Sequence, residues 1–250
     1  MKRATTLFLT GTALVLLAVP QAKAKTFTYA DNWVNWPGSQ YNTTSLGDEN
    51  GTPKIDHMKV TINDGHLDSV SIFLHDSTYR QAFDSLFIST GGAWDSWDYF
   101  VHDGGKGSYQ TNHTDGNVPR NGLYKVESDY TYTYVTGRNR IGNPNGIDKG
   151  SLTNRNSAVG GTLVTGSFGN SISPSSNGGP LVAKIVYDFS NLNNKIAIDP
   201  GTFFVAYAPW CDNDIIGGGT APVPEPATML LFGTGLAGLA TVGRKKLKRD

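Results

Sequence analysis

Residues 59–74 carry the clearest fold signal in the chain, and they read Lys59-Val-Thr-Ile62, Asn63-Asp-Gly-His66 and Leu67-Asp-Ser-Val-Ser-Ile-Phe-Leu74. Its two apolar runs are rich in β-branched residues, which favour strands. The Asp-Gly pair between them is typical of a tight hairpin turn, because both central residues of such a turn adopt positive φ. The stretch therefore predicts two antiparallel strands, 59–62 and 67–74, joined by a short turn.

Further short strands are expected on both sides of this hairpin. Alternating apolar residues in 181–189 predict one buried strand face, and the tyrosines of 130–136 share one face of another strand. The buried face comprises Leu181, Ala183, Ile185, Tyr187 and Phe189, and the tyrosine face comprises Tyr130, Tyr132 and Tyr134. The other expected strands are 84–89, 97–102, 123–126, 162–165, 195–198 and 202–208, with an edge strand and a covering loop within 26–50. Loops are expected at 143–146 and 174–180.

Composition supports a β fold. The chain has 30 Gly residues and 11% aromatic residues, and convincing helical apolar stripes are absent from the body. Only 81–86 could form a short helical turn. About ten short strands with turn signals between them predict an all-β domain, an antiparallel β-sandwich or jelly-roll-like ectodomain over residues 25–217.

The N-terminal residues have the pattern of a secretory signal peptide. Lys2 and Arg3 precede an apolar run at 7–19, and Ala22-Lys23-Ala24 fits an Ala-x-Ala cleavage site. The sequence therefore predicts a signal peptide at 1–24, with the Sec translocon and signal peptidase as partners.

The C-terminal residues have three parts in fixed order. A Gly/Pro hinge at 218–226 contains Val223-Pro224-Glu225-Pro226, and an uncharged apolar segment follows. The prolines hold the hinge extended. The segment 227–243 is predicted to be a single transmembrane helix of minimal length, and the positive-inside rule keeps the basic end 244–250 cytoplasmic. The cations of that end are Arg244, Lys245, Lys246, Lys248 and Arg249.

This tripartite tail resembles the PEP-CTERM sorting signal of Gram-negative bacteria. The resemblance implies that exosortase, an integral membrane enzyme, recognises Val223, Pro224, Glu225 and Pro226 and cuts near them. It also implies transient anchoring in the inner membrane, followed by delivery to the cell surface or the medium, often in strains that make exopolysaccharide. The alternative is an ordinary permanent membrane anchor. Stretches 83–88, 96–101 and 206–217 also loosely resemble exported surface proteins with this tail, which brings no catalytic residues.

Charge limits the partners of the predicted body. The chain has 21 basic and 21 acidic residues, and setting aside eight basic and two acidic residues of the targeting ends leaves 13 and 19, a net charge of −6. An acidic body argues against nucleic acid as a partner.

The single cysteine, Cys211, excludes an internal disulfide framework. The alternatives for Cys211 are a half-buried thiol and an intermolecular disulfide.

Aromatic and acidic residues alternate around 94–103. Trp94, Trp97 and Tyr99 are candidate glycan-binding residues, and the pair Trp33 and Trp36 is an alternative platform. Asp95 and Asp98, with Asp103 nearby, are candidate carboxylates of a glycoside hydrolase. The competing interpretation is a strand of core aromatics with aspartates in turns.

Metal and cofactor signals are weak. Asp212 and Asp214 are candidate Ca²⁺ ligands because Ca²⁺ prefers oxygen ligands, but the EF-hand spacing is absent. The five histidines lack zinc-site spacing, and no G-x-S-x-G motif occurs. We therefore expect no cofactor and no catalytic residues.

The leading expectation is a non-enzymatic cell-surface or matrix protein associated with exopolysaccharide or biofilm. The alternatives are a carbohydrate-binding module and a secreted glycoside hydrolase.

Overall fold

A computed structural model describes residues 24–31, 53–76, 83–104, 119–134, 144–173, 179–209 and 214–220. In chain order the strands are β1 Lys25–Ala30, β2 Ile55–Asn63, β3 His66–Leu74, β4 Phe83–Ser89, β5 Tyr99–Gly104, β6 Gly122–Val126, β7 Tyr132–Tyr134, β8 Pro144–Ile147, β9 Leu152–Asn156, β10 Gly161–Thr165, β11 Ala183–Asp188, β12 Phe203–Pro209 and β13 Ile216–Thr220. A short 3-10 helix, η2, spans Lys149–Ser151.

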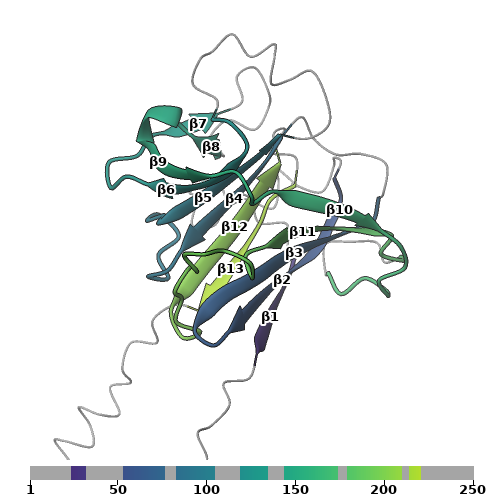
Figure 1. The fold of residues 1–250 in the computed structure, drawn as a ribbon. Coiled ribbons are helices and arrows are strands. Elements are labelled where there is room, and N and C mark those ends of the chain that lie inside the picture. Colours follow the sequence, from purple (N-terminus) through teal and green to yellow (C-terminus); the bar gives the residue numbers. More distant parts are fainter. Residues whose placement is uncertain are drawn as a thin grey trace, which may run out of the picture.

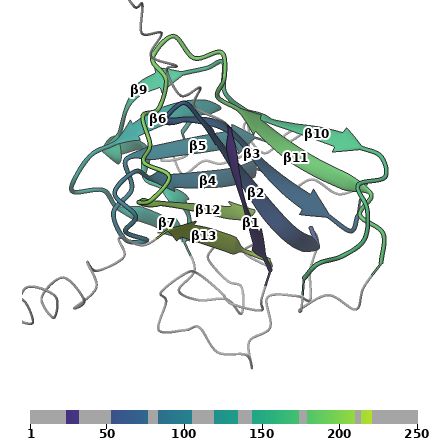
Figure 2. The same cartoon turned by 90° about the horizontal axis from the view of Figure 1, so that it is seen from below.

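The strands form two antiparallel sheets, consistent with the predicted β-sandwich (Figures 1 and 2). The five-stranded sheet has the order β1-β2-β3-β11-β10, and the six-stranded sheet has the order β13-β12-β4-β5-β6-β9. A third, two-stranded sheet consists of β7 and β8. The expected edge strand within 26–50 is present as β1, which pairs only with β2 among the described strands.

The predicted hairpin is confirmed in β2 and β3. Asp64 and Gly65 have φ of 51° and 69°, the positive values that a tight turn of this kind needs. β2 begins at Ile55, four residues earlier than the predicted strand start at Lys59. The earlier start carries a β-bulge between Ile55 and His57.

The main core lies between the two sheets. Period-2 alternation directs every second side chain of each strand inward, and the predicted buried face at 181–189 is confirmed. Core residues from the five-stranded sheet include Met58, Val60, Val70, Ile72, Ile185 and Tyr187, and those from the six-stranded sheet include Leu86, Ile88, Val101, Val205 and Tyr207.

A second apolar cluster lies on the outer face of the six-stranded sheet, beneath β7 and β8. It contains Phe87, Trp97, Phe100 and Ile147 among others. The hydroxyl of Ser85 on β4 donates to the carbonyl of Asn145 on β8 at 2.6 Å. The expected loop at 143–146 was therefore a wrong prediction for 144–146, which form β8 because pairing with β7 and packing on this sheet hold the Pro-Asn-Gly segment extended.

Three other local expectations change. The helical turn suggested at 81–86 is wrong for 83–86, which lie in β4. The strand expected at 195–198 is reduced to a single bridge from Ala197 to His66. Strands β9 and β13 were not predicted, and β13 extends the six-stranded sheet beyond the expected domain boundary at residue 217.

Both ends of the described sandwich lie at the same end of the molecule. Lys25 begins β1 beside the hairpin turn at 63–66, and Thr220 ends β13 beside the turn at 199–202. Backbone hydrogen bonds join these two turn regions. In Figure 1 the chain accordingly leaves β1 and β13 at the lower end of the sandwich.

Candidate functional site

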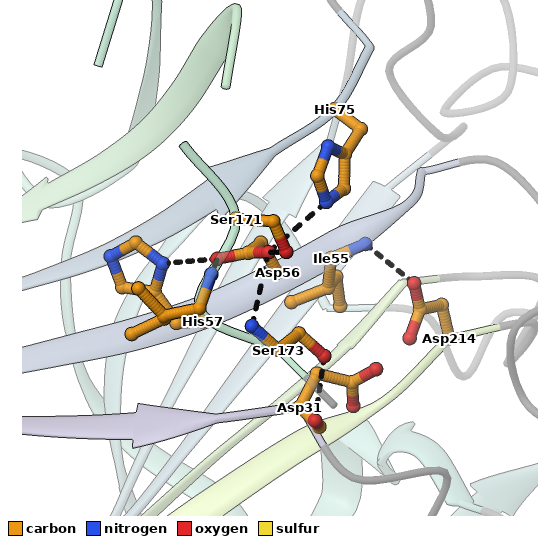
Figure 3. Close-up of polar contacts among 9 residues, drawn as sticks. Asp31, Ile55, Asp56, His57, His75, Ser171, Ser173 and Asp214 are labelled. Atoms are coloured by element: carbon orange, nitrogen blue, oxygen red, sulfur yellow. Dashed lines mark hydrogen bonds and ion pairs between the residues drawn. The ribbon is translucent and has the colours of Figure 1, made fainter. Parts of the chain in front are cut away.

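Asp56, the extra residue of the β-bulge in β2, is the centre of a buried polar network. Ile55 pairs with Leu74 and His57 with Phe73, which leaves Asp56 without a partner position on β3. A bulge re-aims the side chain of its extra residue. The Asp56 side chain is fully buried and points toward the segment 171–173 (Figure 3).

The segment 171–173 donates three hydrogen bonds to the Asp56 carboxylate. The Ser171 hydroxyl donates to Oδ1, the Ser173 backbone N–H donates to Oδ1 at 3.3 Å, and the Ile172 backbone N–H donates to Oδ2 at 3.1 Å. Buried charge needs such compensation. The contacts therefore fix this segment over the start of β2.

Two imidazoles complete the surroundings of this carboxylate. His57 Nδ1 lies 2.7 Å from Oδ2, and His75 Nε2 lies 3.1 Å from Oδ1. Because a carboxylate only accepts hydrogen bonds, both of these nitrogens carry the proton. The His57 ring also stacks on Phe73, with ring centroids 4.2 Å apart and an interplanar angle of 11°.

The pKa directions agree with an ionised Asp56 and a neutral His57. Burial alone raises the pKa of Asp56, but the hydrogen bonds from Ser171, His57 and 172–173 outweigh it, so the pKa lies below its ordinary value. Burial, together with the nearby Lys59 and His75, lowers the pKa of His57, and the opposing effect of Asp56 does not outweigh them. At neutral pH the pair is thus an aspartate and an uncharged imidazole.

The Asp56 network ties together segments that are distant in sequence. The Ser173 hydroxyl donates to the Asp31 carbonyl at 2.7 Å, and the Asp31 N–H donates to the Asp56 carbonyl at 2.9 Å. Nearby, the Ile55 N–H donates to the Asp214 carboxylate at 2.5 Å. The end of β1, the start of β2, the 171–173 segment and the approach to β13 are joined here.

This geometry is that of a structural clamp. In acyl-transfer triads the imidazole lies between the serine and the carboxylate and receives the hydroxyl proton. Here the Ser171 hydroxyl donates its hydrogen bond directly to Asp56. Sequence reasoning missed this network, because Asp56 interrupts a buried run without any motif and the histidines are eighteen residues apart.

Trp97, one of the three candidate glycan residues, lies in the second apolar cluster. Its side chain is 4% exposed and packs against Phe87 and Phe204. Its indole N–H donates to the Tyr132 hydroxyl at 2.7 Å. This placement is that of a core residue, and it does not present a ring face for a sugar.

The other two glycan candidates, Trp94 and Tyr99, have surroundings that differ from those of Trp97. Trp94 is 39% exposed. Tyr99 on β5 is partly buried and packs against the main core between the sheets. The structure therefore does not bring the three rings together into one exposed platform. Trp33 and Trp36 lie outside the described residues.

The candidate hydrolase carboxylates have separate surroundings. Asp98 accepts two hydrogen bonds from Thr90, from its N–H and from its hydroxyl, both at 2.7 Å. Asp95 is exposed, and its carbonyl accepts from the Tyr130 hydroxyl. Asp103 is buried between the sheets and accepts from the Gly161 N–H at 2.8 Å. Asp98 thus has the contacts of a turn aspartate.

The Ca²⁺ candidates fall partly outside the description. Asp214 is buried and binds the Ile55 N–H, whereas Asp212 and Cys211 lie in the range 210–213 that the structure does not describe. Within the described ranges no cluster of three His, Cys, Asp or Glu residues is arranged to hold a metal.

The targeting segments also lie largely outside the description. Ala22 and residues 221–250 are not described, whereas Ala24 is exposed and immediately precedes β1. These undescribed residues include the whole Val223–Pro226 motif, the apolar segment 227–243 and the basic end. Of the helices described, none has the length and apolar character needed to span a bilayer.

Comparison with protein families identifies the C-terminal tail. Residues 222–246 match the PEP-CTERM protein-sorting motif, which confirms the resemblance of the tail and marks an exosortase-sorted protein. No curated protein matches the chain, and no solved structure matches it.

Proposed function

We propose that this chain, which its PEP-CTERM motif marks as an exported protein sorted by exosortase to the cell surface, is a non-enzymatic β-sandwich that associates with extracellular polysaccharide. One observation carries the proposal: β13 ends at Thr220, and the matched motif begins at residue 222. The described fold is therefore complete before the motif begins. Processing at the motif leaves the sandwich intact.

The short connection also constrains how processing takes place. Pro224 is four residues beyond Thr220, so an extended chain places it at most about 14 Å from the end of β13. Exosortase then works close to the end of the sandwich from which both chain termini leave. We propose that 227–243 holds the precursor in the inner membrane during this step, with 244–250 in the cytoplasm, after export through the Sec translocon and cleavage by signal peptidase behind Ala24.

The polar groups support a non-enzymatic role. The carboxylates of Asp56 and Asp98 accept hydrogen bonds from the chain itself. These hydrogen bonds fix both carboxylates in the fold, which supports a structural role for them. A role as a carrier or binder of matrix polymer requires no free carboxylate.

The proposal is tested by the intact mass and the location of the protein in cells with and without exosortase. We expect a product lacking the C-terminal segment, at the surface or in the medium, only when exosortase is present. It should co-purify with polysaccharide from the same cells. An intact tail and an inner-membrane location in both strains would contradict the proposal, as would a product that never accompanies the polysaccharide.

A carbohydrate-binding module with exposed aromatic rings is the second candidate, and the exposure of Trp94 (39%) and Tyr134 (51%) favours it. We expect a glycan-array signal to disappear in a Trp94→Ala, Tyr134→Ala variant. An Ile172→Ala variant removes an equally exposed apolar side chain and is the matched control. Unchanged binding in the double variant would exclude these two rings.

A further inference from the structure

A group of four side chains defines what we call the lysine–phenylalanine patch, on the outer face of the five-stranded sheet. It comprises Lys59 of β2, Phe73 of β3, Lys184 of β11 and Phe168, which follows β10. Lys184 is the direct cross-strand partner of Phe73. Lys59 is the partner of Ser71, one diagonal position away. The strand alternation that directs Met58, Val60 and Ile72 inward directs Lys59, Phe73 and Lys184 outward.

Both lysines converge on one aromatic ring. The Nζ atom of Lys59 lies 4.8 Å from the centroid of the Phe73 ring, and that of Lys184 lies 5.7 Å from it. Lys184 Nζ also lies 5.1 Å from the Phe168 ring. Attraction between an ammonium group and an aromatic face orients such side chains. Both cations are therefore held beside the Phe73 ring rather than dispersed in solvent.

The rings beneath the lysines are themselves fixed in place. Phe73 is stacked on His57 and meets Phe168 edge-on, with ring centroids 6.0 Å apart and an interplanar angle of 81°. His57 is in turn bound to Asp56, whose carboxylate also holds the segment after Phe168. The Asp56 clamp thus positions the aromatic base of the patch.

Neither lysine has a carboxylate partner among the described residues. The ion pairs found there are both between Asp56 and a histidine. Asp188, the acidic residue nearest to Lys184 on β11, accepts hydrogen bonds from Ser190 instead. An external anion can therefore supply the ion-pair partner that each ammonium group lacks within the described residues. The patch is a local concentration of positive charge on a body of net charge −6.

The surrounding face favours a hydroxyl-rich ligand. Thr61, Ser69 and Ser71 lie half-buried on the same face of β2 and β3, and their hydroxyls can donate and accept hydrogen bonds. The half-buried Phe168 ring supplies an apolar surface beside Lys184. An extended sheet face of this kind suits a linear polymer better than a compact ligand.

We infer that the lysine–phenylalanine patch binds a segment of an acidic polysaccharide, with carboxylate groups of the polymer paired to Lys59 and Lys184. This inference rests on the proposed association with extracellular polysaccharide and adds the charge class of the polymer and the surface that binds it. Nucleic acid is disfavoured, because its closely spaced phosphates call for a broad basic surface. A uronic acid polymer carries its charges further apart and suits two cations on an acidic body.

The test measures binding of the full chain, in mild detergent, to immobilised alginate as the polyuronate probe. Neutral dextran, double-stranded DNA and vesicles containing an anionic phospholipid are the comparison probes. We expect alginate binding that weakens as salt is raised and little binding to the other three. The Lys59→Gln, Lys184→Gln variant should lose about tenfold or more in alginate affinity.

Two control variants make the result specific. Lys125→Gln, Lys195→Gln removes the same charge from exposed positions outside the patch and should change the affinity less than about twofold. Lys59→Arg, Lys184→Arg keeps the charge and should retain binding. Circular dichroism confirms that each variant is folded before binding is compared.

Equal alginate affinity in the patch variant and the wild type would overturn the inference, as would equal binding to dextran. Preferential binding to DNA or to the vesicles would also overturn it. These outcomes are separate from the location experiment. If the protein is at the surface but does not bind alginate, the proposed function stands and this inference fails. If it stays in the inner membrane but binds alginate through the patch, the proposed function fails and the patch assignment stands.

Discussion

The ring of Tyr29 lies directly against the backbone of Gly218, so the first and last strands of the described sandwich meet. A Cβ atom on Gly218 would overlap three carbons of the Tyr29 ring. β1 is an edge strand of one sheet and β13 is an edge strand of the other. This contact therefore closes one side of the sandwich, and burial in it raises the pKa of Tyr29 to about 12.

The first prediction concerns this close approach. Gly218→Ala should lower the free energy of unfolding by about 1–3 kcal/mol, because the added methyl group has no space beside Tyr29. Urea unfolding of the mature protein, followed by tryptophan fluorescence, measures the change. Gly91→Ala is the matched control, since a Cβ at Gly91 meets nothing within 4 Å.

A double-mutant cycle identifies the cause of that loss. In a Tyr29→Ala background the ring is gone, so the Gly218→Ala substitution should cost little more than the control. If the cost of Gly218→Ala were the same in both backgrounds, the overlap with Tyr29 would not be its source.

The β13 strand also shows where sequence reasoning reaches its limit. Gly218 and Gly219 fall in the predicted hinge 218–226, because glycine is depleted in strands. They lie in a strand because β12 pairs with them and Tyr29 requires a residue without a side chain at Gly218. The contact with Tyr29 cannot be read from the local sequence, since Tyr29 is far away in the chain.

The same reason explains the other differences. The 59–74 hairpin and the buried face of 181–189 were predictable, because turn chemistry and period-2 alternation are local signals. Pro144-Asn-Gly146 became a strand through its packing on Phe100 and its bond to Ser85. The Asp56 clamp depends on a bulge and on partners more than one hundred residues away, and such contacts leave no periodic pattern.

The second prediction concerns the Asp56 clamp. Asp56→Asn should lower the free energy of unfolding by about 3 kcal/mol, because an amide nitrogen would face donors that now meet a carboxylate oxygen. Amide hydrogen exchange should also accelerate at Ile172 and Ser173, whose N–H groups bind this carboxylate. Asp129→Asn, at an exposed turn position, is the control and should alter neither quantity.

Retention of both stability and slow exchange in Asp56→Asn would contradict the clamp. A loss of stability with unchanged exchange at 172–173 would place the role of Asp56 elsewhere in the fold.

The third prediction is a loss of stability on mild acidification. The pKa of His57 is lowered in the fold by burial, so the unfolded chain takes up the proton first as the pH falls below about 6.5. The contribution of His57 is complete above that pH and declines below it, by at most about 1.4 kcal/mol per pH unit. The lowered pKa of Asp56 adds a loss of the same sign only below its ordinary value of 3.8.

Urea unfolding of the wild type and of His57→Gln between pH 7.5 and pH 5 measures this contribution. The variant should show a shallower decline in the free energy of unfolding across this window. Burial raises the pKa of Asp76, so this group makes the free energy of unfolding increase as the pH falls. That contribution is the same in both proteins and does not change the difference between their pH profiles. Parallel pH profiles would contradict the assignment to His57.

The fourth prediction separates the two tryptophans that sequence analysis grouped as glycan-binding residues. Trp97→Ala should lower the free energy of unfolding by about 3–5 kcal/mol, because it removes a buried ring packed on Phe87 and Phe204. Trp94→Ala should change it by no more than about 0.5 kcal/mol, since this ring is largely at the surface. Urea unfolding of both variants, followed by far-ultraviolet circular dichroism, provides the comparison.

This difference decides how a loss of glycan binding is to be interpreted. If Trp97→Ala unfolds the domain, glycan binding is lost wherever the binding surface lies. A loss of binding in this variant therefore identifies no site. Trp97→Phe keeps most of the apolar volume and removes the hydrogen bond to Tyr132, and we expect it to be folded and to bind as the wild type does. If folded Trp97→Phe lost binding while Trp94→Ala kept it, Trp97 would contact the ligand and its placement as a core residue would be wrong.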